Sequence, residues 1–394
     1  MAKIEAVDFY YCSMPEVLDI GDGSQDLLLV RVQAGPHVGW GECEASPLVS
    51  IASLVCPMSH SACKPVRDSV LGQTLETPQD ITTIGNLVRA NSMDLLQTDH
   101  TLSGIDIAMW DLIGKKLDEP VYRLLGYKQA FPKTPYASVL FGDTPQETLE
   151  KGRKARELNY TAMKFGWGPY GLGTPEVDAE HIAAAREGIG PDSTLLVDVG
   201  TIWKNDIELA RPRIAALKAH KVTWLEEPFV SGALREYSQL ATECAPVKMA
   251  GGEGSHNVHM AQHMIDYAGI GYVQVDAGRI GGITPSFEVA RYARERGVTY
   301  VNHTFTSHLA LAASLHPFAG SQGDEICEYP VKLKSLAHNI TVDHLERDEH
   351  GQINLPDRPG VGIEPDLEAA ARYLVETEIR VGGKVIYETP ALSA

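Results

Sequence analysis

The sequence predicts a parallel α/β barrel joined to a smaller α+β region, and three observations support this fold class. Eight short apolar runs alternate with helical patterns over the second part of the chain. Seven of those runs end in an ionisable residue, at intervals of 23 to 34 residues. The 394 residues also suit one large barrel with an appendage, since domains usually span about 100–200 residues.

The first 130 residues differ in pattern from the rest of the chain. Residues 26–33 and 38–45 predict two strands that form a hairpin, because turn-forming residues separate them. A helical stretch is expected from about Thr77 to Leu117, where apolar residues recur at helical spacing. Two loops of mixed polarity, residues 17–25 and 46–60, are candidates for covering a ligand.

From about residue 135 the pattern becomes strand, helix, strand, helix. Thr144 and Glu147 form a capping box at the start of one helix, and Gly297 occupies the position of a helix C-terminal glycine. An open doubly wound sheet is the alternative to a barrel, but no strand end carries a nucleotide-binding glycine motif. The eight predicted strands are Tyr136–Phe141, Ala162–Phe165, Thr194–Val199, Val222–Leu225, Val247–Ala250, Gly271–Val275, Val298–Val301 and Glu325–Tyr329.

The last part of the chain is expected to complete the N-terminal region. Residues 367–375 have a helical pattern and residues 378–387 resemble a strand. A closed barrel leaves this segment no internal place. We therefore expect an α+β capping domain formed by residues 1–130 and 356–394, and a barrel domain formed by residues 131–355.

Composition excludes several classes of partner. The chain has 34 Lys and Arg residues against 52 Asp and Glu residues, a net charge of −18, which argues against nucleic acid or an anionic membrane surface. The six cysteines form no zinc-binding spacing and are too sparse for a disulfide scaffold. No signal peptide or membrane span is predicted, so we expect a cytoplasmic protein with a small-molecule substrate.

In a parallel barrel the carboxyl ends of all strands meet at one mouth. Clustered carboxylates repel one another and resist ionising together, unless a divalent cation lies among them. The residues that the predicted strands deliver to this mouth are Lys164, Asp198, Glu226, Glu253, Asp276, His303 and Glu328.

Asp198, Glu226 and Glu253 are the predicted metal ligands. They end three consecutive strands, and all three offer hard oxygen donors with no cysteine among them. Such a donor set suits Mg²⁺, or Mn²⁺ in its place, better than Zn²⁺. The adjacent Glu227 is expected to point to the other side of its strand and to form an ion pair there.

Asp276 and His303 end neighbouring strands and predict a catalytic pair. A carboxylate beside an imidazole fixes the ring tautomer and raises the basicity of the ring. His303 is therefore the candidate general base, held in place by Asp276.

This ordered set of residues resembles the enolase superfamily, and within it the mandelate racemase subgroup. The matching sequences are WLEEP, GGE, DAGRIGG, VNH and CEYP, together with the helical segment 103–126. The resemblance implies a modified (β/α)7β barrel with an α+β capping domain. It also implies one Mg²⁺ per subunit, abstraction of a proton α to a carboxylate, and a homo-oligomer.

One position departs from the family pattern. Family members that use two bases carry Lys-x-Lys at the end of the second strand, whereas this chain has Lys164 and then Gly166. The second face of the substrate then lacks its base, which disfavours racemisation and favours β-elimination. By the same resemblance Lys164 and Glu328 are expected to bind the substrate and assist catalysis, with Trp167 as a further substrate contact.

We therefore expect a Mg²⁺-dependent acid-sugar dehydratase that forms a 2-keto-3-deoxy acid. An epimerase, racemase or cycloisomerase acting on a related carboxylate is the first alternative. A degenerate barrel that binds without turnover is the second, and Gly166 alone favours it. The sequence does not specify which acid sugar is bound.

Overall fold

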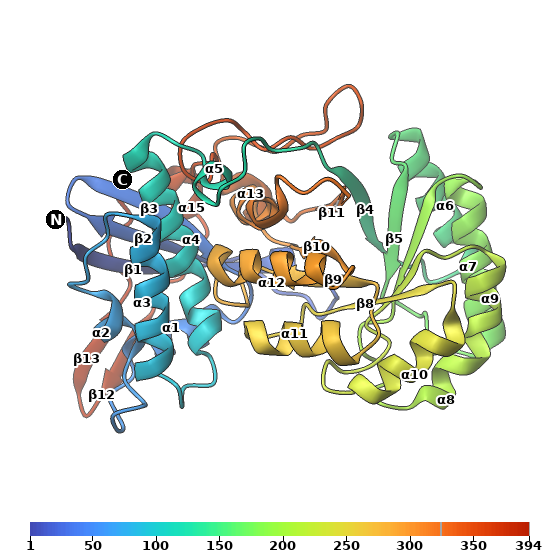
Figure 1. Cartoon of the computed structure of the whole chain (residues 1–394), viewed down its shortest axis with the longest axis horizontal. Coiled ribbons are helices and arrows are strands. Elements are labelled where there is room, and N and C mark those ends of the chain that lie inside the picture. Colours follow the sequence, from blue (N-terminus) through green and yellow to red (C-terminus); the bar gives the residue numbers. More distant parts are fainter. Residues whose placement is uncertain (324, 394) are drawn as a thin grey trace.

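A computed structural model describes residues 1–323 and 325–393 (Figure 1). Its largest sheet has eight strands in the order β10-β9-β8-β7-β6-β5-β4-β11, and every pair in this ladder is parallel. The predicted parallel barrel is thus confirmed. The strands are β4 (Thr134–Leu140), β5 (Ala162–Gly166), β6 (Thr194–Asp198), β7 (Trp224–Glu226), β8 (Lys248–Gly251), β9 (Tyr272–Asp276), β10 (Thr299–His303) and β11 (Ile326–Pro330).

An asparagine side chain bridges the two outermost strands of this sheet. The Asn302 side chain on β10 accepts a hydrogen bond from the Glu328 N–H (2.9 Å) and donates one to the Glu328 carbonyl (3.4 Å) on β11. These bonds replace a backbone ladder where the barrel closes, and they fix Glu328 beside the end of β10. Tyr136, Leu196 and Trp224 are among the buried residues that fill the interior.

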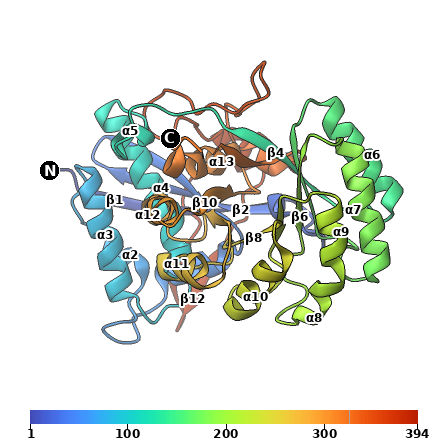
Figure 2. The same ribbon diagram turned by 45° about the vertical axis from the view of Figure 1, so that its right-hand side comes forward.

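Helices alternate with these strands and surround the barrel (Figures 1 and 2). Thr144 caps the first of them by accepting a hydrogen bond from the Glu147 N–H, which confirms half of the predicted capping box, but the Glu147 side chain accepts from the Asp143 N–H instead of the Thr144 N–H. Gly297 follows α12 with a φ of 71°, a conformation that favours glycine. The helices are α6 (Pro145–Glu157), α7 (Pro175–Ile189), α8 (Ile207–Ala210), α9 (Ile214–Ala219), α10 (Leu234–Cys244), α11 (Val258–Tyr267), α12 (Ile283–Glu295) and α13 (His308–Leu315).

The N-terminal region is an antiparallel sheet covered by helices. Its strands β1 (Ile4–Ser13), β2 (Asp26–Ala34) and β3 (His37–Cys43) include the predicted hairpin. Gly39 and Gly41 let α4 approach β3 closely, since a Cβ at either position would lie within 2.2 Å of a backbone oxygen of α4. The helices are α1 (Pro47–Val55), α2 (Val66–Val70), α3 (Pro78–Asn91), α4 (Thr98–Leu117) and α5 (Val121–Leu124).

Two expected elements are wrong in their extent. The single helix predicted from Thr77 to Leu117 is two helices, because Thr98 donates its hydroxyl to the Ser92 carbonyl (2.6 Å) and stabilises a turn between α3 and α4. The strand expected over residues 378–387 is a hairpin of β12 (Glu378–Val381) and β13 (Lys384–Glu388). Gly382 and Gly383 form its turn with φ values of 56° and 80°.

The C-terminal segment lies against the N-terminal sheet, with the blue and red ribbons side by side in both views (Figures 1 and 2). Leu374 forms a bridge with Cys12, and the Tyr387 hydroxyl donates to the Phe9 carbonyl (2.6 Å). Two short helices, α14 (Ser335–Asn339) and α15 (Leu367–Ala371), precede this contact. Within the described residues, every helix is too short or too polar to cross a membrane.

Asp111 joins three parts of the fold from a buried position on α4. Its carboxylate accepts hydrogen bonds from the backbone N–H groups of Trp40 and Val361, both at 2.9 Å. It also forms an ion pair with Lys115 at 2.7 Å. One side chain therefore links β3, α4 and the C-terminal segment.

Replacing Asp111 by Ala is expected to lower the free energy of unfolding by about 3 kcal/mol, because two buried N–H groups lose their acceptor, while Lys115 keeps its ion pair with Glu364. Urea unfolding measures this change. The exposed Glu180 on α7 provides the control, and Glu180→Ala should stay within about 0.5 kcal/mol of the wild type. An equally small effect of Asp111→Ala would contradict this linking role.

Candidate functional site

A cavity of about 270 Å³ opens at the carboxyl ends of the barrel strands. Its lining includes Lys164, Asp198, Glu253, His303 and Glu328, which the sequence predicts as site residues. Glu226 is fully buried and pairs in register with Asp198, next to this cavity. Asp276 pairs in register with His303. The structure thus brings all seven predicted strand-end residues to one mouth.

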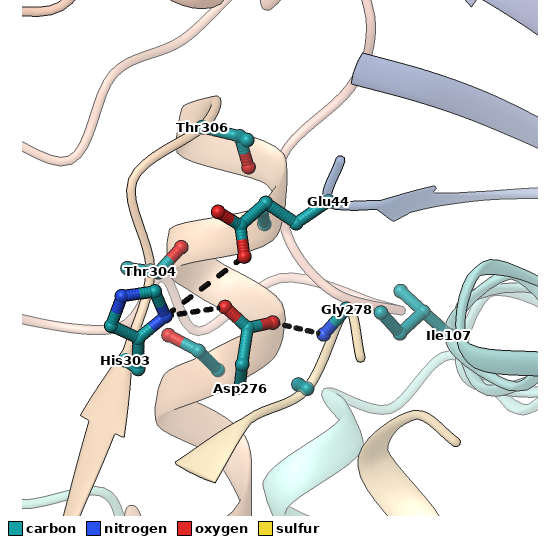
Figure 3. Close-up of a pocket in the computed structure, with 10 residues that line it drawn as sticks. Glu44, Ile107, Asp276, Gly278, His303, Thr304 and Thr306 are labelled. Atoms are coloured by element: carbon teal, nitrogen blue, oxygen red, sulfur yellow. Dashed lines mark hydrogen bonds and ion pairs between the residues drawn. The ribbon is translucent and has the colours of Figure 1, made fainter. Parts of the chain in front are cut away.

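His303 and Asp276 form a hydrogen-bonded pair (Figure 3). The Nδ1 atom of His303 lies 2.6 Å from Oδ2 of Asp276, while Oδ1 of Asp276 accepts a hydrogen bond from the Gly278 N–H at 2.6 Å. Both carboxylate oxygens of Asp276 are therefore committed, which fixes the orientation of the ring. The remaining ring nitrogen, Nε2, is 3.3 Å from Glu253 and 3.8 Å from Glu328.

These carboxylates determine the charge of the imidazole. Burial alone lowers the pKa of His303, but the charges of Glu253 and Glu328 and the bond to Asp276 raise that pKa well above its ordinary value. For Asp276, burial acts to raise the pKa, and the His303 hydrogen bond and Arg279 lower it overall. The pair therefore holds an imidazole whose Nε2 faces the cavity.

The three predicted metal ligands lie at neighbouring strand ends, where Asp198 and Glu226 are buried and Glu253 is partly exposed. Burial raises the pKa of Asp198 to about 6 and that of Glu226 to about 8, although Lys164 opposes both shifts. Burial also acts to raise the pKa of Glu253, but His303 and Arg279 lower it overall. Repulsion among these carboxylates adds to the cost of ionising Asp198 and Glu226. A divalent cation offsets such a cost, and an oxygen-only donor set suits Mg²⁺. The donor atoms of these three residues do not all lie within 4.8 Å of one another in this structure, so binding a cation would require their side chains to move together.

Glu227 is the one residue of this group whose prediction is wrong. Among the described residues it forms no ion pair, and its Oε1 atom has no hydrogen-bond partner. Its backbone has a φ of 39° at the end of β7, which turns the chain out of regular strand geometry. Burial, together with Glu253 and Asp198, raises its pKa well above the ordinary value. Glu227 thus adds a fourth carboxyl group beside the three predicted metal ligands.

Lys164 forms ion pairs with three of the carboxylates. Its Nζ atom lies 2.6 Å from Glu226, 3.0 Å from Glu328 and 3.5 Å from Asp198. Burial acts to lower the pKa of Lys164, but these neighbours raise it well above the ordinary value. The ammonium group stays charged and lies where it can contact an anionic ligand.

Glu328 and Trp167 both line the cavity. Oε2 of Glu328 accepts a hydrogen bond from the Thr304 N–H at 3.0 Å, which holds the carboxylate beside the chain that follows His303. Trp167 is about half exposed and its ring lies against Gly21 and Gly200. A Cβ at Gly200 would lie 2.7 Å from that ring, so a side chain at this position would collide with the indole.

A side chain at position 166 would make a tight contact with Asp198. A Cβ built at Gly166 would lie 3.0 Å from both Cβ and Oδ2 of Asp198. The aspartate side chain fills the place from which a longer side chain would extend. The loss of the second lysine is thus accompanied by packing of a predicted metal ligand against this position.

Two residues in the cavity wall were missed from the sequence. Arg279 donates a hydrogen bond from Nη2 to Oε1 of Glu44 at 2.8 Å, forms an ion pair from Nε to Oε2 at 2.6 Å, and reaches Glu253 at 3.4 Å. Glu44, Asp276 and His303 also have donor atoms within 4.8 Å of one another. Glu44 comes from the N-terminal region, so a search of barrel strand ends does not find it. Arg279 follows Asp276 by three residues, and this proximity was the available signal.

One of the two candidate covering loops lines the cavity. Ile20, Gly21, Asp22 and Gly23 contribute to its wall. The segment 46–60 contributes none of the lining residues, and its residues 47–55 form α1. The N-terminal region therefore reaches the barrel mouth through residues 20–23 and Glu44.

Comparison with known proteins identifies relatives of this chain. Residues 147–370 match the family model described as "Enolase C-terminal domain-like", and residues 14–126 match "Mandelate racemase / muconate lactonizing enzyme, N-terminal domain". A crystal structure titled as a predicted mandelate racemase from Rhodobacter sphaeroides is 59% identical. The match covers 99% of this chain and 100% of that one, with a TM-score of 0.95.

Two curated enzymes show the range of activities among more distant relatives. D-galactarolactone cycloisomerase from Agrobacterium fabrum is 28% identical over 352 residues, covering 85% of this chain and 88% of that protein. D-xylonate dehydratase from Haloferax volcanii is 28% identical over 295 residues, covering 70% of each. The same fold therefore supports both isomerisation and dehydration.

The raised pKa of Glu226 predicts a pH dependence of stability in metal-free protein. The pKa of Glu226 is near 4.5 in the unfolded chain and about 8 in the folded protein, so the folded state binds this proton more tightly. The free energy of unfolding therefore falls as pH rises from about 4.5 to about 8. In EDTA, the free energy of urea unfolding of the wild type should therefore fall with pH more steeply than that of Glu226→Gln, by up to about 1.4 kcal/mol per pH unit within that window. Glu180→Gln should keep the wild-type slope. Equal slopes for Glu226→Gln and the wild type would contradict the raised pKa.

Proposed function

This chain belongs to the enolase superfamily, in its mandelate racemase subgroup, and we propose that it is a Mg²⁺-dependent dehydratase of acid sugars. It would remove the proton α to the carboxylate and eliminate the β-hydroxyl group, giving a 2-keto-3-deoxy acid. The similarity to D-xylonate dehydratase supports this reaction class. A cycloisomerase of a related acid is the second candidate, and the similarity to D-galactarolactone cycloisomerase favours it.

The observation that favours elimination is that the site offers one candidate base, His303, on one side of the substrate. His303 and Asp276 approach from β10 and β9, whereas β5 carries Gly166 where the family's second base would lie. Racemisation needs proton transfer on both faces of the α-carbon. Elimination needs one group that takes a proton and then returns it to the leaving hydroxyl, which His303 can do alone.

Asp198, Glu226 and Glu253 would hold the Mg²⁺. When bound, this cation supplies positive charge that stabilises the ene-diolate form of the substrate carboxylate. Lys164 adds a second positive charge beside the same carboxylates, and Glu328 next to it would contact a substrate oxygen. Trp167 and the 20–23 segment would limit access of water to the reacting atoms.

His303 performs both proton transfers in this proposal. Its Nδ1–H donates to Asp276. Without a cation the neighbouring carboxylates keep the pKa of the ring high, whereas a cation held by Glu253 would offset their charge, so that the neutral ring would present a lone pair on Nε2 to the cavity. The Nε2 atom takes the α-proton as the C–H bond breaks, and then donates it to the β-hydroxyl as the C–O bond breaks. Water leaves, and the enol product converts to the keto acid. Because one imidazole reaches only one face, the elimination is syn.

Incubation with a panel of aldonates and aldarates in the presence of Mg²⁺, with detection of keto acid, tests the proposed reaction. We expect at least one acid to be dehydrated. Formation of an isomer without a keto acid would instead support the cycloisomerase. The absence of any conversion across a stereochemically complete panel would contradict the dehydratase assignment.

His303→Asn should lower kcat by at least about 10⁴-fold, the upper end for positioned acid–base catalysis, because one residue serves both proton transfers. His263, exposed on α11, gives the control, and His263→Asn should keep the wild-type kcat. Steady-state kinetics on the identified substrate measures both variants. A His303→Asn enzyme with more than about a tenth of wild-type kcat would show that another group is the base.

Magnesium should stabilise the protein by about 2.7 kcal/mol at a hundredfold excess over its Kd, because it binds only the folded state. Glu226→Gln should lose most of that stabilisation, whereas Lys164→Met should keep it and lose turnover. Thermal unfolding with and without Mg²⁺ measures the effect. A shift in Tm that is unchanged in single variants of Asp198, Glu226 and Glu253 would contradict the ligand assignment.

A further inference from the structure

We propose that the cavity selects acid sugars with one carboxylate over those with a carboxylate at each end, and that Glu44 sets this preference. In chemical terms, aldonates are favoured over aldarates. The inference builds on the proposed function, because it assumes that the cavity binds an acid sugar. It concerns the part of the cavity that contacts the end of the substrate remote from the reacting carbons.

Both permanent cations of the cavity wall already have carboxylate partners. Lys164 is paired with Glu226 and Glu328 on the floor of the mouth. Arg279 has a hydrogen bond and an ion pair to Glu44 and a further contact with Glu253. Lys164 and one divalent cation suffice for one substrate carboxylate. No unpaired cation of the described cavity wall is left for a second.

The wall also carries an excess of carboxylates. Five of its described residues are acidic, against the two cations named above. Asp22 is held in place by a hydrogen bond from the Ser24 N–H at 2.9 Å and lies at the same mouth as Glu44. A second substrate carboxylate would be repelled there, whereas the hydroxyl groups of an aldonate can donate hydrogen bonds to these oxygens. The five acidic residues are Asp22, Glu44, Asp198, Glu253 and Glu328.

Other lysines lie beside this wall without lining it. Lys334 pairs with the wall residue Asp22 at 3.8 Å. Lys151, Lys154 and Lys332 line an adjacent cavity that contains neither His303 nor the predicted metal ligands. The ammonium group of Lys151 donates to the carbonyls of Leu140 and Phe141, at 2.9 and 3.0 Å. The two cavities share Asp22 and Phe305 in their walls, but none of these three lysines lines the cavity that holds His303.

Glu44 is the residue whose removal would change this balance. Its side chain is only 5% exposed, and both of its oxygens are bound by the Arg279 guanidinium. Replacing Glu44 by Gln removes one negative charge while keeping the shape of the side chain. The guanidinium then loses its strongest partner and becomes available to a second substrate carboxylate.

Calorimetric titration of matched acids with Mg²⁺ present tests the proposal. The probes are galactonate with galactarate, and gluconate with glucarate, so that each pair differs only in the oxidation of one end. In the wild type we expect each bound aldonate to have a Kd at least about tenfold below that of its aldarate. Glu44→Gln should narrow this ratio to about threefold or less. The control Glu16→Gln, an exposed residue outside the cavity wall, should keep the wild-type ratio.

Each outcome has a distinct meaning. An aldarate that binds as tightly as its aldonate overturns the selection, even if both acids are dehydrated and the proposed function stands. A ratio unchanged by Glu44→Gln, in a variant with wild-type Tm, overturns the role of Glu44. Tighter binding of aldonates without turnover supports the selection and contradicts the dehydratase. Binding of neither pair overturns the selection and the proposed function together.

Discussion

The rest of the structure depends on one electrostatic constraint, the convergence of buried carboxylates at the mouth of a parallel barrel. Asp198 and Glu226 end β6 and β7, Glu227 and Glu253 follow β7 and β8, and all of these except the partly exposed Glu253 are buried. Lys164 offsets part of their repulsion, yet the pKa values of Asp198 and Glu226 remain raised. A site of this kind favours a divalent cation and an anionic substrate that shares the cation, which is the chemistry that we propose.

The same constraint explains why the N-terminal region is part of the site. Glu44 extends from the end of β3 to Arg279, and Arg279 in turn contacts Glu253 and lies 3.9 Å from Asp276. The guanidinium lies among three carboxylates that come from two regions of the chain. These contacts keep the Arg279 guanidinium in the cavity wall near His303. The 20–23 segment forms another part of the same wall. The N-terminal region thus contributes a charged residue, Glu44, as well as a loop that covers part of the cavity.

Strand ends were predictable because their chemistry repeats with the barrel unit. Asp276 and His303 were paired from spacing alone, and the structure joins them at 2.6 Å. Glu44 was not predictable in this way, because its contact with Arg279 joins residues 235 positions apart. Glu227 was misjudged because a φ of 39° breaks the alternation of side chains that strand geometry implies. The break between α3 and α4 depends on the Thr98 hydroxyl, whose partner a periodic pattern does not reveal.

The central claim is that His303 is the only base that reaches the α-carbon, since Gly166 leaves the other face without one. Running the reaction in D₂O to partial conversion, and analysing the recovered substrate and product by NMR, tests this claim most directly. We predict that the recovered substrate shows no inversion at C2 and that the elimination is syn. Recovery of the C2 epimer carrying deuterium, or an anti elimination, would show a base on the second face and contradict the account.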